Sequence, residues 1–407
     1  MKPSTQKSIF SKSFSQEVLV GVQGLRSDFV QLLSDLVRIE SPTPDPEAQI
    51  GVFERLAREL RDLDFQVKYF PGRRSGGQMM ARPARRFRPR PYQLLLGHSD
   101  TVWPVGMLEQ MPLTVTEKTL KGPGAFDMKA GLASTIVALK CLRELKMDPH
   151  VTPVLFINSD EELGSEDSER TIRLLARCAD RTLVLEPASG PEGLLKTARK
   201  GVGQFTIRIR GRSAHAGVEP EAGVSAILEL AHLILEMEAL NDPTRGVTVN
   251  VGVVEGGSRP NVVAQNSVAV VDVRVPTIED AHRLEKRFRS LHPTVPGIVL
   301  ETEGGIERMP LERTPRNRVL WNLACEAASQ LGIALGEEMT GGGSDGNIAS
   351  LYTATLDGLG AVGSGAHALH EQVDIDRTLE RSALLAMLLS LGPLKEGTPQ
   401  RPANAPR

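Results

Sequence analysis

Three short apolar runs, each continuous rather than alternating, constrain the fold of this 407-residue chain most strongly. They are YQLLLG, PVLFIN and RTLVLE, and turn residues bound each of them. Strands that are apolar on both sides belong in a sheet that helices cover on both faces. A long amphipathic segment, MKAGLASTIVALKCLRELK, lies between the first two runs. This alternation of strand and helix predicts an α/β domain.

The pattern changes near residue 200. There QFTIRIRG alternates with period two, which indicates a strand with one exposed face. From about 200 to 305 the expected elements follow the order β-α-β-β-α-β, which is the ferredoxin-like arrangement. Helical patterns then return. We therefore predict a large α/β domain over residues 1–199 and 309–407, interrupted by an inserted α+β domain over residues 200–308.

Composition excludes several classes of partner. The formal net charge is −2, so no overall basic field favours nucleic acid or an anionic membrane. No segment approaches the roughly 20 apolar residues of a transmembrane helix. Three widely spaced cysteines predict buried free thiols in a reducing compartment, and the N-terminus has no signal-peptide pattern, so we expect a cytoplasmic protein. The Arg- and Pro-rich stretch 70–92 is predicted to be a solvated hairpin or loop, and the tail 395–407 to be disordered.

Acidic and imidazole side chains gather where the predicted strands end. The residues concerned are His98, Asp100, Asp160, Glu161, Glu162 and Glu186, with Asp127 in the turn before the long helix. In open α/β sheets this edge binds ligands. Several carboxylates in one cleft raise one another's pKa, and a divalent cation removes that cost. Mixed His and carboxylate ligands suit zinc, cobalt or manganese. A second imidazole for two metals is available at His367 or His370.

The segments GHSDTV, GPGAFDMKAG, NSDEELGS, LEP and HALHE follow one another in a recognisable order. With the inserted GRSAHAG, they resemble the zinc metallopeptidase family that includes glutamate carboxypeptidase, acetylornithine deacetylase, succinyl-diaminopimelate desuccinylase and aminoacylase. The likeness covers nearly the whole chain and leans toward glutamate carboxypeptidase. It implies a di-zinc exopeptidase-like catalytic domain, with helices on both faces of a mixed sheet, and an inserted lid and dimerisation domain.

The resemblance also implies a metal centre with two Zn²⁺ ions per subunit, for which Co²⁺ or Mn²⁺ can substitute. Asp127 would bridge the ions. The remaining ligands would be His98 and Glu186 on one ion, and Glu162 and His367 on the other. His367 is preferred to His370 because many relatives carry a polar residue at the latter position. Glu161 would be the general base for attack by a metal-bridged hydroxide, and Asp100 would orient His98.

The family likeness further assigns the inserted domain a part in catalysis. His215 would reach the site from the lid of a partner subunit and stabilise the oxyanion, which predicts a homodimer. The expected substrate-binding residues are Asn261, Arg274, Arg308, Gly342 and Gly343. A guanidinium can hold a substrate carboxylate with two bonds, although Arg274 could equally be an ion-paired strand residue.

The expected substrate is a small peptide or an N-acyl amino acid, cleaved at the amide bond to a C-terminal amino acid. An N-acyl-amino-acid deacylase is the alternative activity. Ser344 also lies in a G-x-S-x-G pattern, but the polar GEEMT before it is no strong strand. Gly358, Gly360 and Gly363 fit G-x-G-x-x-G without a predicted helix to follow. A catalytically inactive binding module would be expected to lose a ligand or the base, and all are present.

Overall fold

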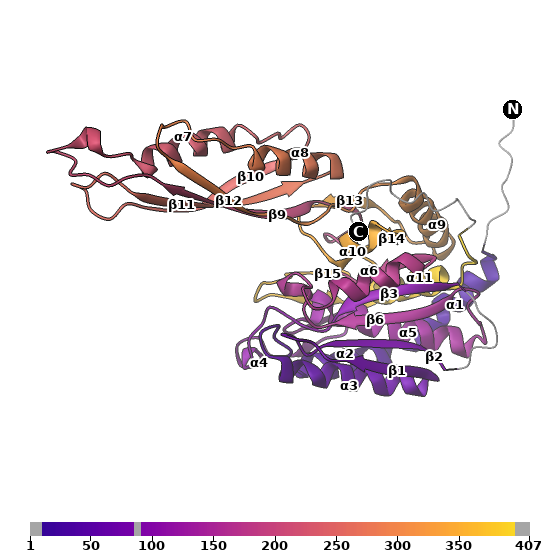
Figure 1. Ribbon diagram of the computed structural model, residues 1–407. Coiled ribbons are helices and arrows are strands. Elements are labelled where there is room, and N and C mark those ends of the chain that lie inside the picture. The colour runs from indigo at the N-terminus through magenta and orange to yellow at the C-terminus, as the bar shows by residue number, and fades with distance from the viewer. Residues whose placement is uncertain (1–9, 85–90, 395–407) are drawn as a thin grey trace, which may run out of the picture. The chain divides into compact units, whose positions relative to one another are not determined.

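The computed structural model describes residues 10–84 and 91–394 (Figure 1). The chain forms two compact units. Unit 1 contains the chain up to Thr197, the segment Arg313–Glu338 and the chain from Ser344 onward, and unit 2 contains Ala198–Glu312 and Met339–Gly343. The predicted disordered tail, 395–407, and residues 85–90 of the Arg-rich stretch lie outside the described residues.

A six-stranded mixed sheet is the centre of unit 1. Its strands, in spatial order, are β1 (Phe65–Phe70), β2 (Gln78–Pro83), β6 (Thr152–Asn158), β3 (Tyr92–His98), β7 (Arg181–Val184) and β14 (Ala354–Leu356). The last four strands run parallel to one another, whereas β2 is antiparallel to both of its neighbours. Because the carboxyl ends of β6, β3 and β7 therefore meet at one edge, the residues that follow them can converge there.

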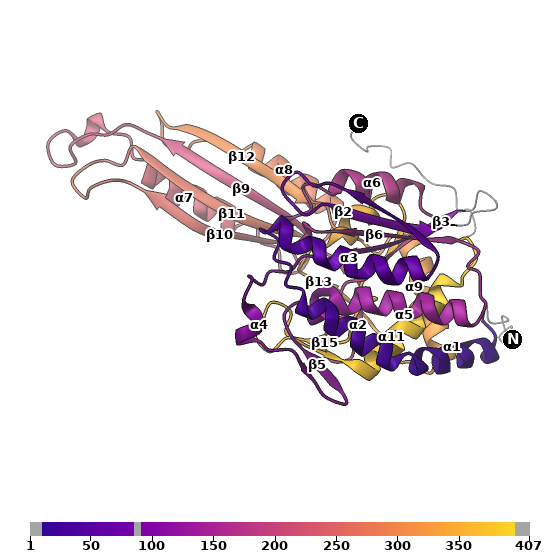
Figure 2. The same ribbon diagram turned by 90° about the horizontal axis from the view of Figure 1, so that it is seen from below.

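Helices cover both faces of this sheet, as the sequence predicts (Figure 2). The α-helices described in unit 1 are α1 (Lys12–Gly24), α2 (Arg26–Arg38), α3 (Pro46–Asp62), α4 (Met107–Gln110), α5 (Ala130–Glu144), α6 (Glu169–Cys178), α9 (Pro315–Leu331), α10 (Asp345–Ser350) and α11 (Ile375–Leu389). On β3, Leu95 packs into the core with α5 and α11, while Leu94 and Leu96 face α6 and α10. Burial on both faces explains why this strand is apolar throughout.

Six short strands complete the pairing. Four form a small antiparallel sheet: β4 (Thr114–Val115), β5 (Thr119–Lys121), β15 (Gly363–Ser364) and β16 (Gln372–Asp374). The other two, β8 (Leu195–Arg199) and β13 (Glu337–Thr340), pair with each other. The polar segment before Ser344 thus forms a short strand after all, because β8 supplies it with a hydrogen-bonding partner.

Unit 2 has the predicted ferredoxin-like order of elements. These are β9 (Gly201–Arg210), α7 (Ala226–Glu238), β10 (Thr248–Gly256), β11 (Asn266–Val275), α8 (Ile278–Arg289) and β12 (Val299–Arg308). The strands form an antiparallel sheet in the order β10-β11-β9-β12, and α7 and α8 pack on one face. In its core Phe205 stacks on Phe288 with ring centroids 4.1 Å apart, so unit 2 has a hydrophobic core of its own.

Two local expectations need correction. The Arg-rich stretch takes part in a hairpin, as predicted, because β1 and β2 pair antiparallel from Phe70 and Gln78 outward. It is not all solvated, because β2 also joins the main sheet through β6 and buries Met79 and Ala81. The three cysteines are free, and burial raises the pKa of the Cys141 thiol to about 11, but Cys178 is exposed at the end of α6. Among the described residues, no helix has both the length and the apolar character needed to cross a membrane.

Close backbone packing at Gly131 brings two of the site's segments together. Gly131 is the second residue of α5, four positions after Asp127. A Cβ atom placed on it would lie 2.0 Å from the carbonyl oxygen of Leu185, the residue just before Glu186. Only glycine therefore allows the start of α5 to approach the segment that follows β7.

Gly131→Ala is accordingly expected to lower the free energy of unfolding by about 1–3 kcal/mol, because the added methyl group must push backbone apart. Gly24→Ala is the matched control, since a Cβ there meets nothing within 4 Å. Urea unfolding followed by circular dichroism compares the two variants. Equal stabilities would contradict the close packing at Gly131.

Candidate metal centre

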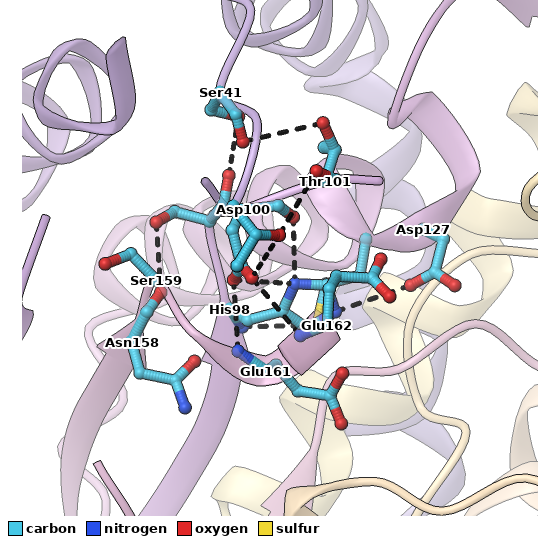
Figure 3. Close-up of polar contacts among 12 residues, drawn as sticks. Ser41, His98, Asp100, Thr101, Asp127, Asn158, Ser159, Glu161 and Glu162 are labelled. Carbon is cyan, nitrogen blue, oxygen red and sulfur yellow. Dashed lines mark hydrogen bonds and ion pairs between the residues drawn. The ribbon is translucent and has the colours of Figure 1, made fainter. Parts of the chain in front are cut away.

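Seven of the predicted site residues come together at the carboxyl edge of the unit 1 sheet. Figure 3 labels His98, Asp100, Asp127, Glu161 and Glu162 among them. His98 is the last residue of β3 and lies in register with Asn158, the last of β6. Glu161 and Glu162 form the turn Glu161–Leu163 after β6. The other members are Asp100, Asp127, Glu186 and His367. β7 ends at Val184, so Glu186 follows the strand rather than ending it.

The His98 imidazole is almost completely buried, and carboxylates face both of its nitrogens. Nε2 lies 3.4 Å from Asp127 Oδ1 and 3.5 Å from Glu186 Oε1. Nδ1 lies 3.0 Å from the main-chain oxygen of Asp100 and 3.4 Å from its Oδ1. An Nδ1–H bond to Asp100 orients the ring with Nε2 toward the centre, so Nε2 is the nitrogen that would bind a metal once the ring is neutral.

Asp127 lies between two imidazoles. Its second oxygen, Oδ2, is 3.5 Å from His367 Nε2, and the same nitrogen is 3.3 Å from Glu162 Oε2. His367 has a φ of +59°, in the left-handed region that non-glycine residues seldom adopt outside constrained sites. His370 is exposed. The geometry thus joins His367 to the cluster through Asp127 and Glu162.

The Asp100 carboxylate also organises the Glu161–Glu162 turn. It is fully buried and accepts hydrogen bonds from the N–H groups of Glu161, at 3.4 Å, and Glu162, at 3.2 Å. The Thr43 hydroxyl donates to it at 3.0 Å. Sequence reasoning gave Asp100 only a contact with His98, because bonds to main-chain donors leave no residue pattern.

Opposite charges shift the pKa values of both imidazoles. Burial alone would lower the pKa of His98, but the carboxylates of Asp100, Asp127 and Glu186 raise it well above its ordinary value. Asp127 and Glu162 raise the pKa of His367 to about 10. Burial acts to raise the pKa of Asp127, yet the two imidazoles hold it below its usual range. Without a metal, protons on the imidazoles offset the carboxylate charge.

The cluster fits a divalent cation. Burial raises the pKa of Glu162, and its Oε1 is buried without a hydrogen-bond partner among the described residues. One ligand atom from each of His98, Asp127 and Glu162 lies within 4.8 Å of the others, as do those of His98, Glu161 and Glu186. Imidazole nitrogens and carboxylate oxygens at this spacing are the donors that zinc, cobalt and manganese take.

Two predicted residues of unit 2 lie in adjoining exposed segments. His215 pairs with Val262 in an isolated antiparallel bridge, and its Nδ1 accepts the N–H of Gly217 at 3.2 Å. The main-chain oxygen of Asn261 accepts the N–H of Ala216 at 3.0 Å. Unit 2 therefore carries His215 and Asn261 as neighbours on its surface.

The remaining predicted substrate-binding residues also belong to unit 2: Arg274, Arg308, Gly342 and Gly343. Arg274 pairs with Asp272 through two bonds of 2.9 Å, so its guanidinium is already engaged within β11. Arg308 ends β12, and its Cδ lies 3.5 Å from a Cβ placed on Gly343. The main-chain oxygens of Gly342 and Gly343 accept hydrogen bonds from the Arg199 guanidinium.

Sequence reasoning missed Arg199 and Glu371 as organisers of this region. Arg199 is buried, and nothing distinguishes it in the sequence from its basic neighbours. Glu371 is the Glu of HALHE, so a signal existed, but only the structure shows that its carboxylate accepts main-chain N–H groups around Asp127. Ser344, the serine of the G-x-S-x-G pattern, has a structural role instead. Its hydroxyl caps α10 and donates a hydrogen bond to Asp357.

Comparisons with known proteins agree with this geometry. Residues 197–295 match a family model described as a peptidase dimerisation domain. Carboxypeptidase G2 of Pseudomonas sp. (strain RS-16) is 30% identical over 380 residues, which cover 89% of each chain. A succinyl-diaminopimelate desuccinylase of Azoarcus sp. (strain BH72) is 26% identical, over 85% of this chain and 92% of that one. The crystal structure of aminopeptidase PepT from Bacillus cereus ATCC 10987 superposes with a TM-score of 0.73 at 22% identity, covering 90% of this chain and 98% of that one.

An α/β domain with His and carboxylate groups at its sheet edge, interrupted by a peptidase dimerisation domain, defines a metal-dependent peptidase or amidohydrolase. The extent of the match to carboxypeptidase G2 identifies the family. The chain belongs to the M20 family of metallopeptidases.

Because an imidazole must be neutral to bind a metal, metal binding is expected to release protons from His98 and His367. Zn²⁺ affinity should rise with pH between 6 and 8, by roughly tenfold per pH unit for each proton displaced. Isothermal titration calorimetry in buffers of different ionisation enthalpy counts the protons. His370→Asn should behave as the wild type, whereas His367→Asn should release fewer protons. A pH-independent affinity would contradict the assignment.

The raised pKa of His367 makes the stability of the metal-free protein depend on pH. Protonated His367 stabilises the fold fully below its ordinary pKa of 6.5, and this contribution is lost as the pH rises toward about 10. Chelator-treated protein should therefore lose thermal stability over that range, and His367→Asn should lose less.

Proposed function

We propose that this protein is a dinuclear zinc hydrolase that cleaves an amide bond to a C-terminal amino acid, as a carboxypeptidase does. One observation carries the proposal. The two oxygens of Asp127 face two imidazoles from different parts of the chain, His98 at 3.4 Å and His367 at 3.5 Å. A carboxylate with a His on each side is the arrangement expected of a ligand shared by two ions.

In the proposed centre, His98 and Glu186 would hold one ion, His367 and Glu162 would hold the other, and Asp127 would serve both. When bound, zinc supplies Lewis acidity toward the scissile carbonyl and lowers the pKa of a catalytic water. Co²⁺ or Mn²⁺ can take its place.

The chain's own residues supply proton transfer and orientation. Glu161 takes a proton from the attacking water and delivers it to the leaving amine nitrogen. It suits this role because Asp100 holds its backbone N–H while the side chain stays among the metal ligands. Arg274 and Arg308 are the candidates to bind a substrate carboxylate, and Arg274 also pairs with Asp272. Gly342 and Gly343 would line the substrate, and Asn261 would donate to it.

The homodimer is proposed to form through unit 2. The outward side of α7 leaves Ile227, Leu228 and Leu235 exposed, with Leu235 at 72%. Next to α7, the edge strand β10 exposes Val253 and Val254. An apolar helix face beside an unpaired strand edge is a typical association surface, and the dimerisation-domain match supports this use. His215 would then complete the site of the partner subunit.

A deacylase is the second candidate, because the desuccinylase relative matches nearly as much of the chain as the carboxypeptidase does. Both activities hydrolyse an amide bond with the same residues, so the acyl group distinguishes them. A panel of C-terminal glutamyl dipeptides and N-acetyl and N-succinyl amino acids, assayed with added Zn²⁺ or Co²⁺, separates the two.

Glu161→Gln is expected to lower kcat at least 100-fold on the preferred substrate of that panel while two metal ions per subunit remain bound, because the amide cannot accept the proton. Elemental analysis and initial rates measure the two effects. Glu166→Gln, on the exposed side of the same segment, is the matched control and should keep full activity. An active Glu161→Gln enzyme would refute the assigned base. Wild-type protein that binds metal without hydrolysing any compound would favour a binding module.

Mixed dimers test whether His215 acts across subunits. His215→Ala and Glu161→Gln homodimers should each be nearly inactive. Co-expressed heterodimers should recover up to half of the wild-type activity, because one of their two sites has an intact Glu161 and an intact partner His215. Differently tagged subunits allow the heterodimer to be purified. No recovery in a heterodimer that binds metal normally would contradict action in trans.

A further inference from the structure

The Glu371 carboxylate lies near the proposed metal centre and accepts hydrogen bonds on both of its oxygens. It is 1% exposed. Oε1 accepts the N–H groups of Phe126 at 2.8 Å and Asp127 at 3.0 Å. Oε2 accepts the N–H of Gly124 at 3.0 Å and the indole Nε1–H of Trp103 at 2.7 Å. A carboxylate offers about four lone-pair positions, so these four donors use essentially its full accepting capacity.

The four bonds join three chain segments that carry proposed ligands. Glu371 itself follows His367 by four residues. Its main-chain partners, Gly124, Phe126 and Asp127, form the turn that presents the Asp127 carboxylate. Trp103 lies five residues beyond His98 on the segment that leaves β3. One side chain therefore fixes the Asp127 turn against both segments from which the imidazoles come.

This arrangement requires an ionised carboxylate. All four contacts are N–H donors, so each carboxylate oxygen must accept two hydrogen bonds. A glutamine at this position would turn an NH₂ group toward two of those donors and leave them unpaired in a buried place. A buried charge with four fixed partners restrains the backbone more firmly than a neutral contact does.

We propose that Glu371 is a positioning residue for the metal centre, which holds Asp127 at the spacing that two ions require, and that Trp103 makes this restraint observable. The inference rests on the proposed dinuclear function. Glu371 acts through the main chain of Asp127 and touches no substrate. Groups that orient metal ligands from behind typically change metal affinity or activity 10–100-fold when they are replaced.

A buried Glu in unit 2 provides the matched control. Glu229 is fully buried, and its carboxylate accepts the N–H groups of Thr294 and Val295. Glu229→Gln therefore removes a buried carboxylate that restrains a loop, as Glu371→Gln does, but in the inserted domain. A loss of metal affinity common to both variants would reflect a general loss of stability. A loss of metal affinity in Glu371→Gln alone would reflect a change at the metal centre.

The test titrates chelator-treated full-length protein with Co²⁺ and records stoichiometry, affinity and the visible absorption of the bound ion. Glu371→Gln should weaken the binding of at least one ion 10–100-fold, alter the Co²⁺ spectrum and lower kcat with KM changed less than about threefold. Glu371→Asp, which keeps the charge, should recover part of the affinity. Glu229→Gln should give the wild-type affinity and spectrum.

Tryptophan fluorescence adds a readout that is independent of activity. The chain has two tryptophans, Trp103 and Trp321, and Trp321 lies in the unit 1 core on α9. In a Trp321→Phe background, Trp103 emission should change as Co²⁺ or Zn²⁺ saturates the site, and Glu371→Gln should abolish that change. Trp103→Phe removes one of the four donors and should weaken metal binding 2–10-fold, whereas Trp321→Phe alone should not.

Wild-type affinity and an unchanged Co²⁺ spectrum in Glu371→Gln would overturn the proposal. If Glu371→Gln does not fold, Trp103→Phe carries the test, and unchanged metal affinity in that variant would overturn it. If the wild-type protein binds no metal at all, the proposed function fails, which is a different result from a normal metal centre in Glu371→Gln.

Discussion

Asp127, Glu162 and Glu186 place three carboxylates around two imidazoles at the carboxyl edge of one sheet, and this concentration of charge governs the rest of the site. Like charges so near one another in a buried place destabilise the fold unless cations offset them. Protonated His98 and His367 supply part of that compensation in the metal-free chain. A pair of divalent ions would supply it more fully and would make the imidazoles neutral ligands.

Other features of unit 1 can be understood as supports for this constraint. The apolar strand β3, buried on both faces, gives His98 a rigid base. Gly131 allows α5 to reach the segment before Glu186. Behind the ligands, Asp100 holds the Glu161–Glu162 turn through main-chain N–H groups, and Glu371 holds the Asp127 turn in the same way. Two buried carboxylates, Asp100 and Glu371, thus position the segments that carry the proposed metal ligands.

Much of the fold and most of the centre could be predicted from sequence because their physical signals are local. Continuous apolar runs mark doubly covered strands, and β9 shows one-sided burial in its alternation. The convergence of His98 with Glu162 and Glu186 followed from a rule about sheet edges. The Arg-rich stretch was predicted to be solvated because the sequence of β2 is polar in places, but the pairing of β2 with β6 buries Met79. Arg199 and the bonds of Glu371 could not be predicted, since they act on main-chain atoms of distant segments.

The central claim is that Asp127 is shared by two metal ions. Anomalous diffraction at the zinc absorption edge, from crystals of the full-length enzyme grown with Zn²⁺, tests it most directly. The account predicts two peaks per chain, each about 2.0–2.2 Å from a different oxygen of Asp127, with His98 on one and His367 on the other. A single peak that touches only one imidazole, or two peaks that do not share Asp127, would contradict it.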